Sequence, residues 1–195
     1  MSRTGLLAAL AVAALISGCG SPQSAPAESS GATASETAAL TPGNNATDRA
    51  FAYGMLAQRP QIEHLVQLAR TNSGNPSMVA MADTLAVSEQ QQGETINALL
   101  VQWTDGEEGG QGPPPDGPTL FDRGAVERLG SLQGPEFDKL WLQVMLNHHQ
   151  AVMTMASSEI REGEDINAKT LAQAIITTRQ EEIVHMQQLM GGIPR

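Results

Sequence analysis

Two adjacent histidines, His148 and His149, lie in a stretch whose apolar residues recur at helical spacing. Met145 stands one turn before the pair and Met153 follows four residues after His149, so that Met145, His149 and Met153 share one face of a helix. Imidazole and thioether donors together suit Cu(I), while imidazole alone also suits Cu(II) or Zn²⁺. The spacing therefore predicts a soft or borderline transition-metal site inside a helical bundle.

A second stretch, near the C-terminus, carries Glu182, His185 and Met186 within one helical turn. Glu182 is expected either to bind the metal directly or to accept a hydrogen bond from the far nitrogen of His148, which would fix the tautomer of that ring. We expect Met145 to be the leading thioether ligand, with Met153 and Met186 as secondary candidates and His185 at the rim.

Each of these residues also has a simpler interpretation. Methionines commonly fill irregular gaps in a core, and Met153 and Met155 cannot face the same way on one helix. His148 could be a buried histidine satisfied by Glu182 alone, and His149 could be an exposed helix residue. His64 has no histidine near it in the sequence and is interpreted as structural or surface.

The elements expected to position these residues are two helical hairpins related by an offset of 90 residues, which aligns Phe51 with Trp141 and Met55 with Met145. Hairpin 1 is expected at about 48–103 with helices at 48–72 and 76–103, and hairpin 2 at about 135–191 with helices at 136–162 and 166–190. Asn75-Pro76 and Asp165 are helix-start signals, Gly191-Gly192 is a stop signal, and Pro60 should kink the first helix. A Gly- and Pro-rich loop and a short helix at 121–131 fill 104–134. The pattern predicts an all-α four-helix bundle built from two repeated hairpins. In the last helix the apolar stripe is expected to run as follows: Leu171, Ile175, Thr178, Glu182, His185 and Leu189.

The first residues predict export. Arg3 and the apolar run from Gly5 to Ile16 are typical of a signal peptide at 1–18, and Ile16-Ser17-Gly18-Cys19 resembles the lipobox of bacterial lipoproteins. By that resemblance Cys19 carries a lipid that anchors the protein to a membrane, and residues 19–46 are a disordered tether before a domain at 47–195. We therefore expect a bacterial cell-envelope protein at the periplasmic or extracellular face.

Composition excludes other classes. Cys19 is the one cysteine, so the domain has no disulfide and no cysteine-ligated zinc or iron–sulfur site. The net charge is −10 for the whole chain and −11 once Arg3 is removed with the signal peptide, which argues against a nucleic-acid partner. No Ser-His-Asp set, phosphate loop or nucleotide motif is present, so that an enzymatic activity is unsupported.

An ordered series of residues resembles the bacterial family known as domain of unknown function 305. The resemblance covers roughly 48–191, and its specific part is 129–190. It implies a ferritin-like four-helix bundle, export and, from some members, copper binding and copper tolerance in the periplasm. The residues that carry it are 129–138, Trp141-Leu142, Met145, His148-His149, Ala151, Met155-Ala156, Glu182-Ile183 and Met186.

The chain departs from this family pattern at several positions. Asn147 stands where members commonly have proline, Gln58-Arg59 stand where the first hairpin would repeat the histidine pair, and Gln92 stands where it would repeat Glu182. If the site needs both hairpins, half of it is missing, or a second copy of the chain completes it in a homo-oligomer. Glu182-x-x-His185 also matches half of a ferritin-like di-iron motif, but the other carboxylates are absent.

The sequence thus predicts a lipid-anchored metal-binding protein that binds, buffers or delivers copper, with no protein partner specified. Two alternatives remain: a structural or interaction lipoprotein without metal, and a di-iron-type oxidase.

Overall fold

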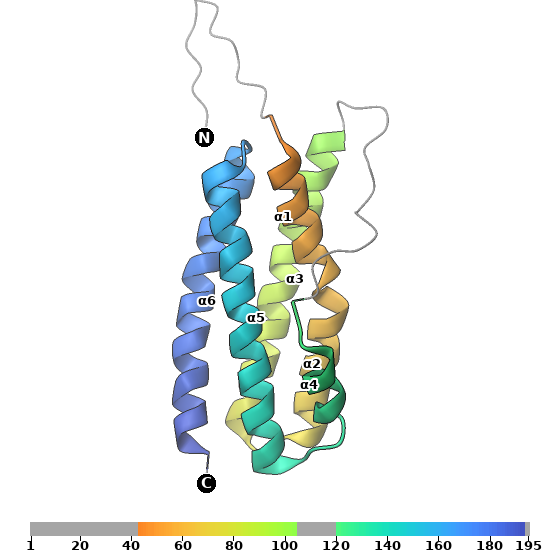
Figure 1. Cartoon of the computed structure of the whole chain (residues 1–195), viewed down its shortest axis with the longest axis vertical. Coiled ribbons are helices and arrows are strands. Elements are labelled where there is room, and N and C mark those ends of the chain that lie inside the picture. The colour runs from red at the N-terminus through yellow and green to blue at the C-terminus, as the bar shows by residue number, and fades with distance from the viewer. Residues whose placement is uncertain (1–42, 105–119, 194–195) are drawn as a thin grey trace, which may run out of the picture. The chain divides into compact units, whose positions relative to one another are not determined.

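The structure is a computed structural model that describes residues 43–104 and 120–193. The expected signal peptide, Cys19, nearly all of the expected tether and most of the loop that begins at 104 lie outside the described residues. Within the described ranges the chain is all-helical (Figure 1). The helices are α1 (Ala46–Ala57), α2 (Arg59–Asn72), α3 (Pro76–Thr104), α4 (Arg123–Leu129), α5 (Gly134–Glu162) and α6 (Ile166–Gly192).

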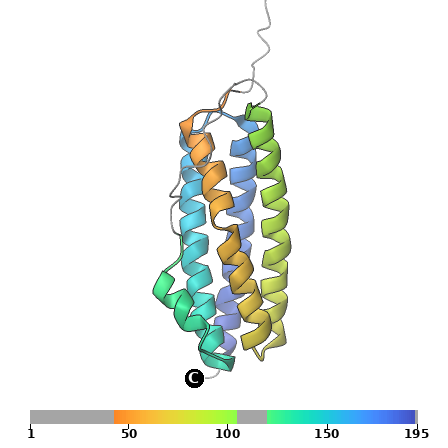
Figure 2. The same ribbon diagram turned by 90° about the vertical axis from the view of Figure 1, so that its right-hand side faces the viewer.

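The long helices form a four-helix bundle in which α1 and α2 together make one rod (Figures 1 and 2). The expected break in this rod is confirmed: Gln58 ends α1 and begins α2, and Pro60 lies in the first turn of α2. Proline is tolerated there because the first helical N–H groups have no partner within the helix. The short helix α4 packs beside α5, outside the four rods (Figure 2).

Side-chain caps set the helix starts. Asp165 accepts hydrogen bonds from the backbone N–H groups of Asn167 and Ala168, and Asn75 accepts one from Ser77, so both predicted starts are confirmed. The predicted end of the last helix, at 190 before Gly191-Gly192, is two residues short, because α6 includes both glycines and is capped at Ile193.

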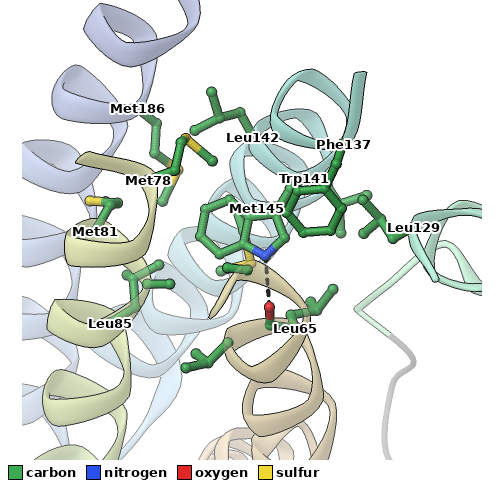
Figure 3. Packing of buried hydrophobic residues seen from close by; sticks show 14 of the residues in the cluster. Leu65, Met78, Met81, Leu85, Leu129, Phe137, Trp141, Leu142, Met145 and Met186 are labelled. Carbon is green, nitrogen blue, oxygen red and sulfur yellow. Dashed lines mark hydrogen bonds between the residues drawn. The ribbon is translucent and has the colours of Figure 1, made fainter. Parts of the chain in front are cut away.

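The core consists of two apolar clusters stacked along the bundle. The first, which we call the α4-end cluster, surrounds Trp141, whose indole N–H donates to the Leu65 carbonyl at 2.9 Å (Figure 3). The second, the α1-end cluster, surrounds Phe51, Met55 and Trp103. Between these clusters each long rod buries at least one polar side chain, which places a buried polar layer across the middle of the bundle: Gln58, Glu89, His148, His149, Arg179 and Glu182.

The apolar stripe expected on the last helix is wrong in part. The buried line of α6 runs through Ala168, Ala172, Ile175, Arg179, Glu182 and Met186, whereas Thr178 is half-buried and His185 is exposed. The helix is therefore rotated relative to the expectation, and a charged residue takes a core position. No helix among the described residues combines the length and the apolar character that a membrane span requires.

Candidate functional site

The buried polar layer is the candidate functional site. It lies where the two apolar clusters meet, at the level of the break between α1 and α2. Its titratable side chains come from α3, α5 and α6, and each is less than 9% exposed: Glu89, His148, His149, Arg179 and Glu182. Burying so many titratable groups is costly unless they are paired, so their partners decide what the layer can do.

Arg179 is the centre of the layer and is fully buried. Its Nη1 donates to Glu182 Oε2 at 2.5 Å, while its Nη2 donates to a Glu89 oxygen and to Gln92 Oε1, the latter at 3.0 Å. The planar guanidinium therefore joins α6 to α3 through Glu89 and Gln92 while it also contacts Glu182 on its own helix, a geometry that a lysine could not reproduce.

His149 extends this network to α5. Its Nε2 lies 2.7 Å from the same Glu182 oxygen that Arg179 contacts. Burial lowers the pKa of His149, although Glu182 opposes that shift. Burial raises the pKa of Glu182, but His149 and Arg179 outweigh it and the pKa of Glu182 is lowered. A neutral imidazole thus donates Nε2–H to an ionised carboxylate, which can only accept.

His148 differs from its neighbour. The ring is fully buried, and among the described residues neither Nδ1 nor Nε2 has a hydrogen-bond partner. It stacks on Phe121 with 4.3 Å between centroids and 10° between planes, and it meets the His149 ring edge-on at 5.7 Å. Burial, with His149 and Arg179 nearby, lowers the pKa of His148 well below its ordinary value. An unpaired neutral imidazole therefore stands in the core with a lone pair to offer.

The structure brings some of the predicted site residues together and separates others. His149 and Glu182 are brought together as expected, but Glu182 pairs with His149 and not with His148. Both histidines are buried, which rules out the simpler interpretation of His149 as an exposed residue. Figure 3 shows Met145 beside Trp141 and Met186 beside Met78, all within the α4-end cluster.

The remaining candidates lie further out. Met153 is half-buried, and His185 and His64 are exposed. Within residues 43–104 and 120–193, no three histidine, cysteine or acidic side chains are grouped as a metal would require. A metal site at His148 would therefore need donors beyond these side-chain types, and Met145 is the buried methionine one turn away.

Sequence reasoning missed Arg179, Glu89 and Phe121. A signal for the first two was present, since Glu89 and Arg179 are 90 residues apart, the offset that aligns the two hairpins. An arginine and a glutamate at matching positions of adjacent helices suggest a pair across the bundle. Phe121 follows a segment outside the described residues, and no local pattern links it to His148.

A second buried polar group lies at the α1 end. Asp48 on α1 accepts hydrogen bonds from the backbone N–H groups of Glu164 and Asp165, in the turn between α5 and α6. Asp165 also accepts from Trp103 Nε1 at 2.9 Å, and the Glu159 carboxyl is fully buried against Asp48. This cluster ties the start of α1 to the α5–α6 turn.

Fold and site together define a class of protein: an all-helical bundle whose core is interrupted midway by a layer of buried imidazole and charged side chains. The chain belongs to the family described as "Domain of unknown function (DUF305)", whose sequence model matches residues 48–190. This confirms the family expected from the sequence. No curated protein sequence matches the chain.

Several solved structures share the fold. A DUF305 fragment from Deinococcus radiodurans is 22% identical with a TM-score of 0.66, covering 77% of this chain and 99% of that one. A putative secreted DUF305 protein from Streptomyces coelicolor is 21% identical with a TM-score of 0.64, covering 74% and 91%. CopM in its Cu(I)-bound form is 20% identical with a TM-score of 0.62, covering 75% and 97%. At this level of identity the likeness establishes the fold alone.

Proposed function

We propose that this chain is a metal-binding lipoprotein of the bacterial cell envelope that holds a soft monovalent ion, Cu(I) or Ag(I), at His148. One observation carries the proposal. A fully buried, neutral imidazole leaves both nitrogens unpaired among the described residues, although an unpaired buried polar group ordinarily costs about 1–3 kcal/mol. A bound metal would use one of these nitrogens.

The donors around His148 support a soft ion. Met145 is buried one turn before His148, and a thioether needs no deprotonation to bind a metal. Glu182 is already paired with Arg179 and His149, so it supports the site by orienting His149 and is not a free ligand. Neutral nitrogen and sulfur donors without an available carboxylate favour Cu(I) over harder divalent ions.

The relatives support the same choice of metal. CopM, which shares the fold, is described in Cu(II)-bound, Cu(I)-bound and Ag-bound forms. The Streptomyces coelicolor neighbour is described as a putative secreted protein, which agrees with export.

The test is titration of the full-length protein with Cu(I) in competition with a chromophoric chelator. We expect about one ion per chain, and loss of binding in the double variant His148→Ala/His149→Ala. The matched control is His64→Ala/His185→Ala, which removes two exposed histidines and should bind as the parent does. Equal binding by all three proteins would refute the assignment.

A second pair of variants tests the thioether. Met145→Leu keeps the volume of a buried side chain and removes its sulfur, so we expect roughly tenfold weaker Cu(I) binding, about 1.4 kcal/mol. Met81→Leu makes the same change elsewhere in the α4-end cluster and should leave the affinity unchanged. Equal affinities in the two variants would remove Met145 from the ligand set.

The lipid anchor is a separate part of the proposal, because Cys19 lies outside the described residues. Acyl chains buried in a bilayer stabilise binding by about 0.8 kcal/mol per CH₂. Cys19→Ser should therefore move the protein from the membrane fraction to the soluble fraction of the cell envelope. Retention of that variant on the membrane would argue against lipidation at this position.

One observation favours a structural role without metal as the second candidate. The charged side chains of the layer pair with one another without an ion: Arg179 contacts Glu89 and Glu182, and Glu182 contacts His149. In that case the double histidine variant would lose stability while the parent protein bound no copper.

A further inference from the structure

A cavity of about 430 Å³ lies between α2 and α4, beside the polar layer. Its walls include Gln58, Gln61, His64 and Phe121. His64 is exposed and Gln58 is buried, so the cavity leads from the surface toward the break between α1 and α2. That break is at the level of His148.

Phe121 belongs both to the cavity wall and to the surroundings of His148. Phe121 is half-buried and lines the cavity. Its ring also stacks on the His148 ring, nearly parallel, with 4.3 Å between the centroids. Two aromatic rings at that spacing are in van der Waals contact, so nothing passes between them. The phenyl ring therefore covers one face of an imidazole that is otherwise enclosed by the bundle.

The inner cavity wall is polar and only partly satisfied. Gln58 donates through Nε2 to the Met55 sulfur at 3.2 Å, while Gln58 Oε1 and Gln61 Nε2 are buried without partners among the described residues. Carbonyl oxygen and imidazole along the wall can lower the cost of moving a cation out of water. Arg123 and Glu127 on α4 also line the cavity, with opposite charges.

We propose that this cavity is the access route to His148 and that Phe121 is the side chain that closes it. A soft monovalent ion enters past His64 and Gln58, and reaches the imidazole when the phenyl ring rotates aside. The identity of the ion rests on the proposed function, but the route itself does not. Phe121 is a positioning residue: it controls access to His148 and donates nothing to a metal.

The first test measures access without any metal. Diethylpyrocarbonate acylates neutral imidazole, and peptide mass spectrometry reports the rate at each histidine of the full chain. The exposed His64 and His185 serve as internal references, and His148 and His149 should be protected in the parent. In Phe121→Ala we expect His148 to react at least about tenfold faster relative to these references, while His149 stays protected.

The matched control is Leu68→Ala, which removes a side chain from the same cavity and from the edge of the α4-end cluster. It should leave His148 protected. An unchanged rate at His148 in Phe121→Ala would overturn the proposal. Equal exposure of His148 in both variants would overturn it too, because general loosening would then explain the access.

The second test measures Ag(I) and Cu(I) exchange by stopped flow. Removing a cover that is not a ligand should raise the association and dissociation rates together, at least about tenfold, and change the affinity less than threefold. Weaker binding that comes from faster dissociation alone, with an unchanged association rate, would make Phe121 a support of the site and overturn the route. A parent that binds neither ion would refute the proposed function, while the acylation rates would still decide the route.

Discussion

Two regions of the molecule bury charged side chains, and they pair them differently. In the cluster at the α1 end, the carboxylates of Asp48 and Asp165 accept hydrogen bonds from backbone N–H groups and from the Trp103 indole. In the central layer the partners are other side chains, with Arg179 between Glu89 and Glu182. The first arrangement closes a turn and caps a helix, so the Asp48 and Asp165 oxygens are used by the fold, although the buried Glu159 oxygens have no hydrogen-bond partner among the described residues.

In the central layer, by contrast, some buried polar groups have no hydrogen-bond partner among the described residues. His149 is positioned by a hydrogen bond to Glu182, whereas the His148 nitrogens have no hydrogen-bond partner in the part of the chain that the structure describes, and its ring contacts Phe121 and His149. A fold that needed only stability would gain from an apolar residue at this position. Burial alone therefore does not mark a functional site. His148 stands out because its unpaired group is a neutral imidazole, which can bind a metal through a ring nitrogen.

The largest effect is expected from breaking the central network. Arg179→Met leaves Glu89 and Glu182 buried without their shared cation, so we expect the free energy of unfolding to fall by about 3–5 kcal/mol. Urea denaturation of the variant and the parent measures this difference in the free energy of unfolding. Arg70→Met is the matched control, because Arg70 pairs with Asp83 at the surface and such pairs contribute about 0–1 kcal/mol. Similar losses in the two variants would show that the layer is not a buried ion network.

The next effect contrasts two buried aspartates, Asp48 and Asp138. Burial raises the pKa of Asp48, but the Asn45 N–H, Glu159 and the N–H groups of the α5–α6 turn outweigh it and lower that pKa. Burial raises the pKa of Asp138, which has an unpaired Oδ1 among the described residues. The ionised form of Asp48 is therefore stabilised in the folded protein, whereas the ionised form of Asp138 is destabilised.

Asp48→Asn should consequently cost about 1–3 kcal/mol near neutral pH, since its –NH₂ group would meet backbone N–H donors. Asp138→Asn should be neutral or stabilising. Chemical denaturation of both variants at one pH gives the comparison. A loss of the same size at both positions would contradict the contrast drawn between the two carboxylates.

Much of the fold was predictable because its signals are local. Capping residues and proline act on the backbone of their own or the next turn. The helix starts at Asn75-Pro76 and Asp165 and the break at Pro60 were therefore predicted correctly. The level of the layer was predictable from the histidine pair and Glu182. The rotation of α6 was not, because Thr178 and Arg179 are neighbours and only the partner on α3 decides which one is buried.

The last effect, which appears only as a dependence on pH, concerns the titration of Glu159 at the α1 end. Burial, with Asp48 beside it, raises the pKa of Glu159 to about 8 in the folded protein, against an ordinary value of 4.5. Below pH 4.5 both the folded and the unfolded state hold the proton, and between 4.5 and about 8 the folded state holds more, so stability falls as pH rises through this window. Glu159→Gln keeps the shape without ionising, and its stability relative to the parent should rise from pH 5 to pH 9. Parallel curves of unfolding free energy against pH would show that Glu159 is already ionised in the fold.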